Sequence, residues 1–379
     1  ARSRAEIPRV LAKVPTPRSA SILTRRLAAH DPQLRDSVLK SLNKMRARHP
    51  QLKFDKGLVD EEIQVEAARF CQLAHLRGLL PPAGPAAALL ARALGEMQQG
   101  HLERVFRLLA LRYPPKDMED AYHGLVSGRR RLQANAREFL DNILDRRHAR
   151  VVAIMLAGVI GPDENQAHGK GDGGGEGGLC PIKARLTDGS PRLENTRQAL
   201  DFMAAHYDPW LAACAIHAGA KVPNPAARAY LEKKEETMLS PLEKALVLQN
   251  VEIFKEVPID QLAALGSIAR EVAVEAGKTV YRAHDRPDGM YLVMEGAVNL
   301  SNEDQVVYVA GPQDPFGLWE LLDEQPRLLT AVAARESRLL AINGEEFHDL
   351  MADDVRIMKG IIRTVSRRLR EMTRGQPLR

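Results

Sequence analysis

The sequence predicts an α+β protein of more than one domain, in which stacked helices precede a smaller β-rich domain. Its 379 residues are enough for two or three domains. Residues 1–245 contain 38 basic and 28 acidic side chains, whereas residues 246–379 contain 16 and 21. The apolar residues keep a helical spacing up to about residue 269 and alternate from residue 270 onward. The opposite charges and the change of period favour two domains, 1–240 and 241–379.

Helix pairs are predicted throughout residues 1–240. Asp31-Pro32 stands between two apolar stripes and can end one helix and begin the next, and Asp208-Pro209 stands in a similar place. Residues 127–144 form a looser third unit without this dipeptide. Its predicted buried stripe is Leu132, Ala136, Phe139, Leu140, Ile143 and Leu144.

These helical units resemble the HEAT repeat, although any other packed helix pair fits the same pattern. The resemblance implies an irregular α-solenoid that offers extended surfaces to partner proteins. The glycine-rich segment 158–178 interrupts it and contains GKGDGGGEGG. In that run Gly169-Lys170 is followed by Gly171, where a phosphate-binding P-loop has Ser or Thr. We therefore expect a linker or surface loop there.

Several classes of protein are disfavoured by what the sequence lacks. Three cysteines, Cys71, Cys180 and Cys214, give no disulfide framework and suit a reducing, cytoplasmic setting. No 18-residue apolar run and no signal peptide are present. We find no HExxH, no GxSxG and no convincing set of metal ligands. The sequence thus predicts a non-enzyme without a metal or a cofactor.

The C-terminal domain has the pattern of a β-roll. Short alternating strands recur at a spacing of about ten residues, and turns such as residues 285–289 separate them. Residues 250–374 resemble the cyclic-nucleotide-binding domain family. The resemblance rests on Ile253-Phe254 before Val257-Pro258, on the segments AGKTV and DGMYLVMEGAV, and on FGLWELLDEQPRLLTAVAA. It implies a β-roll with flanking helices, and cAMP or cGMP as the ligand.

The last of these segments resembles the family's phosphate-binding cassette. Gly317 lets a ligand approach the backbone at the start of a short helix, Arg327 can form paired hydrogen bonds to a cyclic phosphate, and Thr330 can donate a hydroxyl. Two residues depart from the family: Leu318 replaces the usual Glu that accepts from the ribose 2′-hydroxyl, and Leu328 replaces a small residue. The candidate ligand-binding residues are Phe316, Gly317, Leu318, Arg327, Leu328 and Thr330.

Loss of the Glu is expected to weaken binding by about 1.5–3 kcal/mol, or roughly ten- to a hundredfold. Glu320 lies two residues further on and is expected to be a poor substitute. We expect Trp319 in a core or interface, with stacking on a base as the alternative. Weakened cyclic-nucleotide binding, a silent interaction domain and a different anionic ligand therefore all stay open.

Residues 355–372 form the predicted closing helix, which in this family moves over the base when ligand binds. Its predicted apolar stripe is Val355, Met358, Ile361, Ile362, Val365, Leu369 and Met372. The opposite face contains four arginines, which fit either a solvated surface or contact with an acidic partner or anionic lipids. Little chain follows this helix, so we expect no helix-turn-helix and no specific nucleic-acid binding.

The two parts together resemble the soluble tail of bacterial membrane proteins that begin with a major-facilitator or nucleotide-translocase-like domain. The segments PRVLAKVPT and DPQLRDSVLKSLNKMRARHP carry this resemblance, and the chain begins with Ala1 and not Met. It implies a cytoplasmic regulatory sensor at the inner face of a membrane, attached to a transporter. The alternative is a ligand-free scaffold whose helical repeats bind a protein partner. The sequence leaves the transported substrate and the oligomeric state open.

Overall fold

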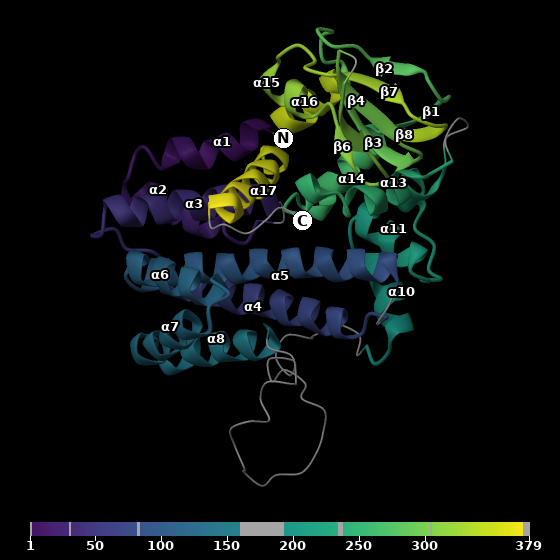
Figure 1. Ribbon diagram of the computed structural model, residues 1–379. Coiled ribbons are helices and arrows are strands. Elements are labelled where there is room, and N and C mark those ends of the chain that lie inside the picture. Colours follow the sequence, from purple (N-terminus) through teal and green to yellow (C-terminus); the bar gives the residue numbers. More distant parts are fainter. Residues whose placement is uncertain are drawn as a thin grey trace. The chain divides into compact units, whose positions relative to one another are not determined.

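The computed structural model describes residues 2–29, 32–81, 84–159, 193–233, 238–303 and 305–373. It divides into two compact units, which are coloured along the sequence in Figure 1. Unit 1 comprises residues 1–79 and 94–193, and unit 2 comprises residues 80–93 and 194–379. Most of the glycine-rich segment predicted at 158–178 lies outside the described residues. The domain boundary at 240/241 stays a prediction.

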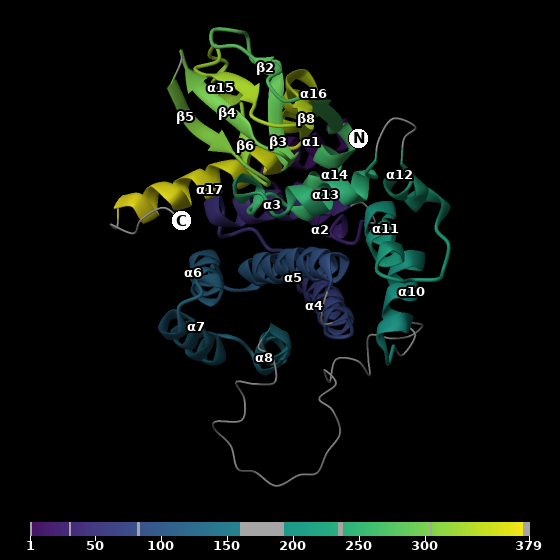
Figure 2. The same cartoon turned by 45° about the vertical axis from the view of Figure 1, so that its right-hand side comes forward.

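Unit 1 is entirely helical in its described part. Its helices pack around one aliphatic core, and α4 and α5 are the longest (Figures 1 and 2). Local signals set the helix ends: Thr16 and Ser19 form a capping box, and Asp55 accepts from the backbone amides that open α4. The helices are α1 (Arg2–Leu11), α2 (Pro17–Arg25), α3 (Pro32–Arg48), α4 (Lys56–Gly78), α5 (Pro85–Arg112), α6 (Pro115–Val126), α7 (Arg130–Ile143) and α8 (Arg146–Val159). The first turns of α5, up to Ala93, belong to unit 2.

The predicted helix pairs are present, but a regular HEAT-like repeat is not established. Helices α6 and α7 pack on each other, and Ala136, Leu140 and Leu144 of the predicted stripe are buried. The prediction was wrong for Leu132 and Phe139, which are exposed.

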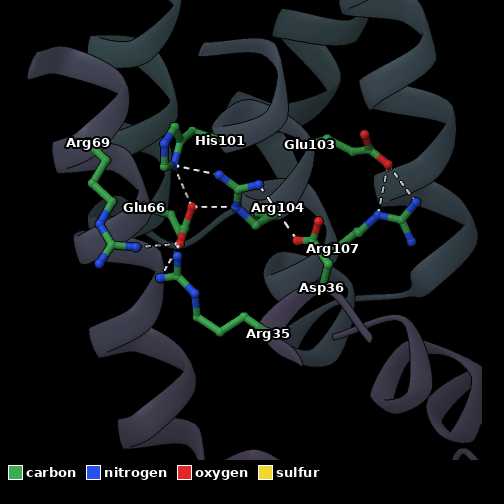
Figure 3. Close-up of polar contacts among 8 residues, drawn as sticks. All are labelled: Arg35, Asp36, Glu66, Arg69, His101, Glu103, Arg104 and Arg107. Atoms are coloured by element: carbon green, nitrogen blue, oxygen red, sulfur yellow. Dashed lines mark hydrogen bonds and ion pairs between the residues drawn. The ribbon is translucent and has the colours of Figure 1, made fainter. Parts of the chain in front are cut away.

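A buried carboxylate ties three helices of unit 1 together (Figure 3). Glu66 on α4 is 3% exposed and receives Arg104 Nε at 2.7 Å and His101 Nδ1 at 2.6 Å, both from α5. Arg35 of α3 and Arg69 of α4 reach its other oxygen at 3.4 and 3.3 Å. Burial alone would raise the pKa of Glu66, but the hydrogen bond from His101 and the charge of Arg104 lower it to about 2. The carboxylate is therefore ionised whenever the fold is intact near neutral pH.

The α-helical part of unit 2 precedes its sheets. Helix α10 spans Thr196–His206 and packs on α11, Pro209–His217. The predicted helix start at Asp208-Pro209 is confirmed, because the Asp208 side chain accepts from the Leu211 amide at 3.0 Å. Shorter segments follow as η2 (Pro225–Ala227) and α12 (Arg228–Leu231). Across the described ranges of both units, no helix is both long and apolar enough to span a bilayer.

Two four-stranded antiparallel sheets form the β-roll of unit 2, as the alternating period predicted. Their strand orders are β1-β8-β3-β6 and β2-β7-β4-β5. The inner faces contribute a core that includes Val293, Val298, Phe316 and Leu339. The strands are β1 (Arg270–Val274), β2 (Thr279–Tyr281), β3 (Gly289–Glu295), β4 (Val298–Asn302), β5 (Gln305–Ala310), β6 (Pro315–Phe316), β7 (Thr330–Ala333) and β8 (Ser337–Asn343).

Helices precede and follow the strands of the roll in the sequence, and the short helix α15 lies between β6 and β7. Helix α13 begins with a capping box between Ser240 and Glu243 and packs on α14. The sheets and these two helices appear in Figure 2. The flanking elements are α13 (Pro241–Leu248), η3 (Glu252–Phe254), α14 (Ile259–Ile268), α15 (Trp319–Asp323), α16 (Gly344–Asp353) and α17 (Arg356–Thr373).

The closing helix is present as α17, but the face predicted to be buried is wrong in part. Ile357, Ile361 and Thr364 are buried, whereas Val355, Met358, Ile362 and Leu369 are exposed. The helix buries this face because Gly360 packs closely against the backbone that follows η3. A Cβ at Gly360 would lie 2.7 Å from both the Glu256 carbonyl oxygen and the Val257 Cα. Of the predicted basic face, Arg367 is paired with Glu252 at 2.8 Å.

We expect Gly360→Ala to lower the free energy of unfolding by about 1–3 kcal/mol, because overpacking against rigid backbone outweighs the better helix propensity of Ala. Urea denaturation of the full chain measures this. The matched control is Gly78→Ala on α4, where a Cβ meets no atom within 4 Å. A Gly360→Ala protein as stable as wild type would show that α17 docks less closely than described.

Candidate functional site

The candidate site is centred on Arg327, which lies in the segment between α15 and β7. The backbone amide of Arg327 donates to the Asp285 carbonyl at 2.9 Å, and the His284 amide donates to the Arg327 carbonyl at 2.8 Å. These two bonds fix Arg327 beside the 285–289 turn that the sequence predicted. The Arg327 side chain is fully buried, at 0% exposure. A buried guanidinium needs acceptors, because an unpaired buried charge is strongly destabilising.

The protein itself supplies those acceptors. Arg327 Nη1 donates to the Gly317 carbonyl at 2.7 Å, and Nη2 donates to the Gly289 carbonyl at 2.5 Å and to Asp288 Oδ1 at 2.9 Å. Glu320 Oε2 lies 3.9 Å from Nη1. The Arg327 Nε atom is buried and has no hydrogen-bond partner among the described residues. Most donors that could hold a phosphate are thus already engaged within the fold.

Tyr281 contacts the guanidinium and belongs to a cluster of three aromatic rings with Tyr291 and Phe316. The Arg327 Cζ lies 4.2 Å from the Tyr281 ring centroid, a cation–π contact, and Tyr291 stacks on Phe316 at 5.3 Å between centroids. Burial raises the pKa of the Tyr281 phenol, and burial with the neighbouring Asp288 raises the pKa of Tyr291 to about 12. Both phenols therefore stay neutral at physiological pH and add no negative charge to the site.

Gly317 is required by this geometry. Its φ is +72°, and a Cβ there would lie 2.5 Å from Arg327 Nη1. A side chain at this position would be strained and would also displace the guanidinium. The predicted close approach at Gly317 is therefore real, but the group that approaches is the chain's own arginine.

The other predicted site residues are only partly brought together. Phe316 and Leu318 are buried in the domain, at 4% and 3% exposure, whereas Leu328 is 72% exposed. Thr330 begins β7, and its Oγ1 accepts from the Ala283 amide at 3.0 Å. Trp319 is 53% exposed, so of its predicted places the core is wrong, whereas an interface and stacking on a base stay predictions.

Sequence reasoning missed several partners of Arg327. The sequence indicates only a turn at Asp288, and it indicates only that Glu320 lies a few residues beyond Gly317. Neither pattern shows the contact with Arg327. Tyr281 gave no signal beyond a strand position. Asp288 and Arg327 are 39 residues apart in the sequence and come together only through the pairing of strands. No local sequence pattern indicates this contact.

Two four-stranded antiparallel sheets with flanking helices define a β-roll domain, and Arg327 is buried within it. Residues 271–354 match the family model of the cyclic nucleotide-binding domain, so this part of the chain is a domain of that family. The sequence prediction of this domain is confirmed. The match does not extend to the helices of unit 1.

Curated relatives share the same region. A CRP-like cAMP-activated global transcriptional regulator of Mycobacterium tuberculosis is 26% identical over 129 residues, covering 33% of this chain and 58% of the relative. The cyclic AMP receptor protein of Thermus thermophilus is 31% identical over 100 residues, covering 25% of this chain and 46% of the relative. A cAMP-dependent protein kinase regulatory subunit of Eremothecium gossypii is 32% identical, covering 32% of this chain and 26% of the relative. The chain thus spans about half or less of these relatives.

Solved structures show the same local likeness. The N-terminal domain of a transcriptional regulator from Streptomyces coelicolor is 28% identical, with a TM-score of 0.31, over 35% of this chain and 99% of that one. The regulatory domain of Toxoplasma gondii PKA with cAMP is 26% identical, with a TM-score of 0.29, over 32% and 46%.

Proposed function

We propose that this chain is a cytoplasmic, non-enzymatic sensor in which the β-roll binds a cyclic nucleotide, with cAMP first among the candidates. The observation that carries the proposal is the position of Arg327, buried beside Gly317 in a domain that matches the cyclic nucleotide-binding family. The names of three similar proteins include cAMP or cyclic AMP, which supports that choice of ligand.

A route for the signal to leave the β-roll supports a regulatory role. The segment at η3 is held from two sides within unit 2. Helix α17 places Gly360 against Glu256 and Val257, while Arg92 of α5 donates to the carbonyls of Lys255 and Val257 at 2.9 and 2.5 Å. Movement of α17 would therefore displace residues 255–257, which Arg92 in the first turns of α5 also contacts. Helix α5 continues from Leu94 into unit 1.

Calorimetric titration of the full chain with cAMP and with cGMP tests the proposal. We expect saturable binding with a Kd weaker than micromolar, because Leu318 offers no acceptor for a ribose hydroxyl. Arg327→Lys should abolish detectable binding, since lysine lacks the bidentate geometry. The matched control is Arg335→Lys, an exposed arginine that donates to the Gly296 carbonyl. Absence of wild-type binding at millimolar nucleotide would exclude the proposal.

A ligand-free interaction scaffold is the second candidate. The observation that favours it is that Arg327 is satisfied by Gly317, Gly289 and Asp288 without any ligand. Under this alternative the helical surfaces of unit 1 bind a protein partner, and the β-roll serves only as structure. The titration separates the two candidates, because the scaffold gives no heat with any cyclic nucleotide.

Attachment to a membrane transporter is a further part of the proposal. It is supported by the resemblance of residues 8–16 and 31–50 to the tails of such proteins. Determining the coding sequence upstream of Ala1 tests it directly. Membrane-spanning segments there would support the attachment, and a start codon directly before Ala1 would exclude it.

A further inference from the structure

Glu320 is a carboxylate on α15 that lies within ion-pair distance of Arg327. Its side chain is 12% exposed, and its Oε2 lies 3.9 Å from Arg327 Nη1. Among the described residues, Glu320 forms an ion pair with Arg327. A carboxylate that is mostly shielded from water and has one cationic partner is left uncompensated when that partner turns to another anion.

Asp288 is in a different position, although it also contacts Arg327. It is 67% exposed, so water can solvate it when the pair is broken. It also accepts hydrogen bonds from the Tyr291 hydroxyl at 3.3 and 3.4 Å. Loss of Arg327 to a ligand therefore costs Asp288 little, whereas it isolates Glu320.

An entering cyclic phosphate meets this arrangement directly. It carries a negative charge and needs the Nη1 or Nη2 donors of Arg327, which face Glu320 and Asp288. If the phosphate takes Nη1, it comes within a few ångströms of the Glu320 carboxylate, and like charges repel strongly where water is excluded. Leu318 is buried at 3% and brings no donor that could offset this repulsion.

We propose that Glu320 is an intramolecular competitor for Arg327 and thereby sets the nucleotide affinity of this domain. In the absence of ligand its carboxylate occupies the electrostatic role that the cyclic phosphate takes when bound. Binding then requires Glu320 to leave Nη1, so affinity is low and depends on this residue. The inference rests on the proposed function and identifies the residue that determines affinity within the same site.

Calorimetric titration of the full-length Glu320→Gln protein with cAMP tests this inference. Glutamine keeps the size of the side chain and removes its charge, so we expect cAMP to bind about ten- to a hundredfold more tightly than to wild type. The control is Glu324→Gln, which makes the same chemical change at an exposed position at the end of α15. It should leave the affinity unchanged. An unchanged or weaker affinity of Glu320→Gln would overturn the proposal, and a weaker one would show that Glu320 accepts from the ligand.

Thermal unfolding without nucleotide separates this inference from the proposed function. If Glu320 is the counter-ion of Arg327, Glu320→Gln lowers the Tm of wild type but has a smaller effect in an Arg327→Gln background. An unchanged or higher Tm for Glu320→Gln overturns the inference, and this comparison needs no Arg327 variant. If no protein binds a cyclic nucleotide but the two residues are coupled, the proposed function fails while the competitor contact stands.

Discussion

Arg327→Ala is expected to lower the free energy of unfolding by about 2–4 kcal/mol, in addition to removing any nucleotide binding. The change empties a fully buried volume and leaves the carbonyls of Gly317 and Gly289 without their donor. It also removes the cation that faces Tyr281 and the half-buried Glu320. Urea unfolding followed by circular dichroism of the full chain measures the loss.

The control for this result is Arg335→Ala. Arg335 is exposed and donates to one carbonyl, that of Gly296, so its loss should change the unfolding free energy by at most about 1 kcal/mol. If the two substitutions had equal effects, Arg327 would not be the centre of the β-roll's polar network. Its role would then be limited to ligand contact.

Glu66→Ala is expected to destabilise unit 1 by about 3–5 kcal/mol, because it leaves the cations of three helices without their common anion. The three cations are Arg35 of α3, Arg69 of α4 and Arg104 of α5, and the buried His101 ring contacts the same carboxylate (Figure 3). The same figure contains the control. Glu103 pairs with Arg107 one turn away on the surface, so Glu103→Ala should cost at most about 0.5 kcal/mol. Chemical unfolding of both variants provides the comparison, and equal losses would contradict the role given to Glu66.

Acid titration of stability gives a second measurement of the same cluster. The pKa of Glu66 is lowered to about 2, so its contribution is complete above its ordinary pKa and is lost as the pH falls from about 5 toward 2. Burial also lowers the pKa of His101, so protonation below its ordinary pKa near 6.5 destabilises the fold further. The pKa of Glu62 is raised by burial, which offsets part of this loss.

For Glu66 the shift corresponds to about 3 kcal/mol between neutral pH and pH 2. The Glu66→Gln protein should therefore lose less stability than wild type between pH 6 and pH 3. Urea midpoints measured across that range test the sign. A variant whose stability falls as steeply as that of wild type would show that other carboxylates control acid unfolding.

The fold was predictable where local signals and tertiary packing agree. The Asp208 cap, the strands of the β-roll and its flanking helices could all be located from residue pattern and resemblance. The apolar stripe of α17 was assigned to the wrong face in part, because both faces of the helix carry apolar residues. What selects between them is the contact of Gly360 with the backbone of Glu256, which depends on a segment about a hundred residues earlier.

For the site, the sequence identified Arg327 and Gly317 but not their relation. A motif shows which residues can bind a phosphate, but it does not show whether their donors are already bonded to acceptors of the same chain. The carbonyl of Gly317 and the carboxylate of Asp288 accept from Arg327 only because strand pairing brings residues 285–289 and 317 to the same place. Such acceptors are spread along the chain and have no spacing of their own.

Helix α5 has a consequence for how this protein can be divided. One helix of 28 residues contributes its first turns, up to Ala93, to unit 2 and the remainder to unit 1. Unit 2 is therefore built from two separate segments of the sequence, residues 80–93 and 194–379. Cutting the chain near residue 240 removes part of it and does not isolate the unit. A fragment that begins at Pro241 lacks Arg92, and the carbonyls of Lys255 and Val257 lose that donor. Nucleotide affinities measured on such a fragment would describe a β-roll whose support at η3 has been removed.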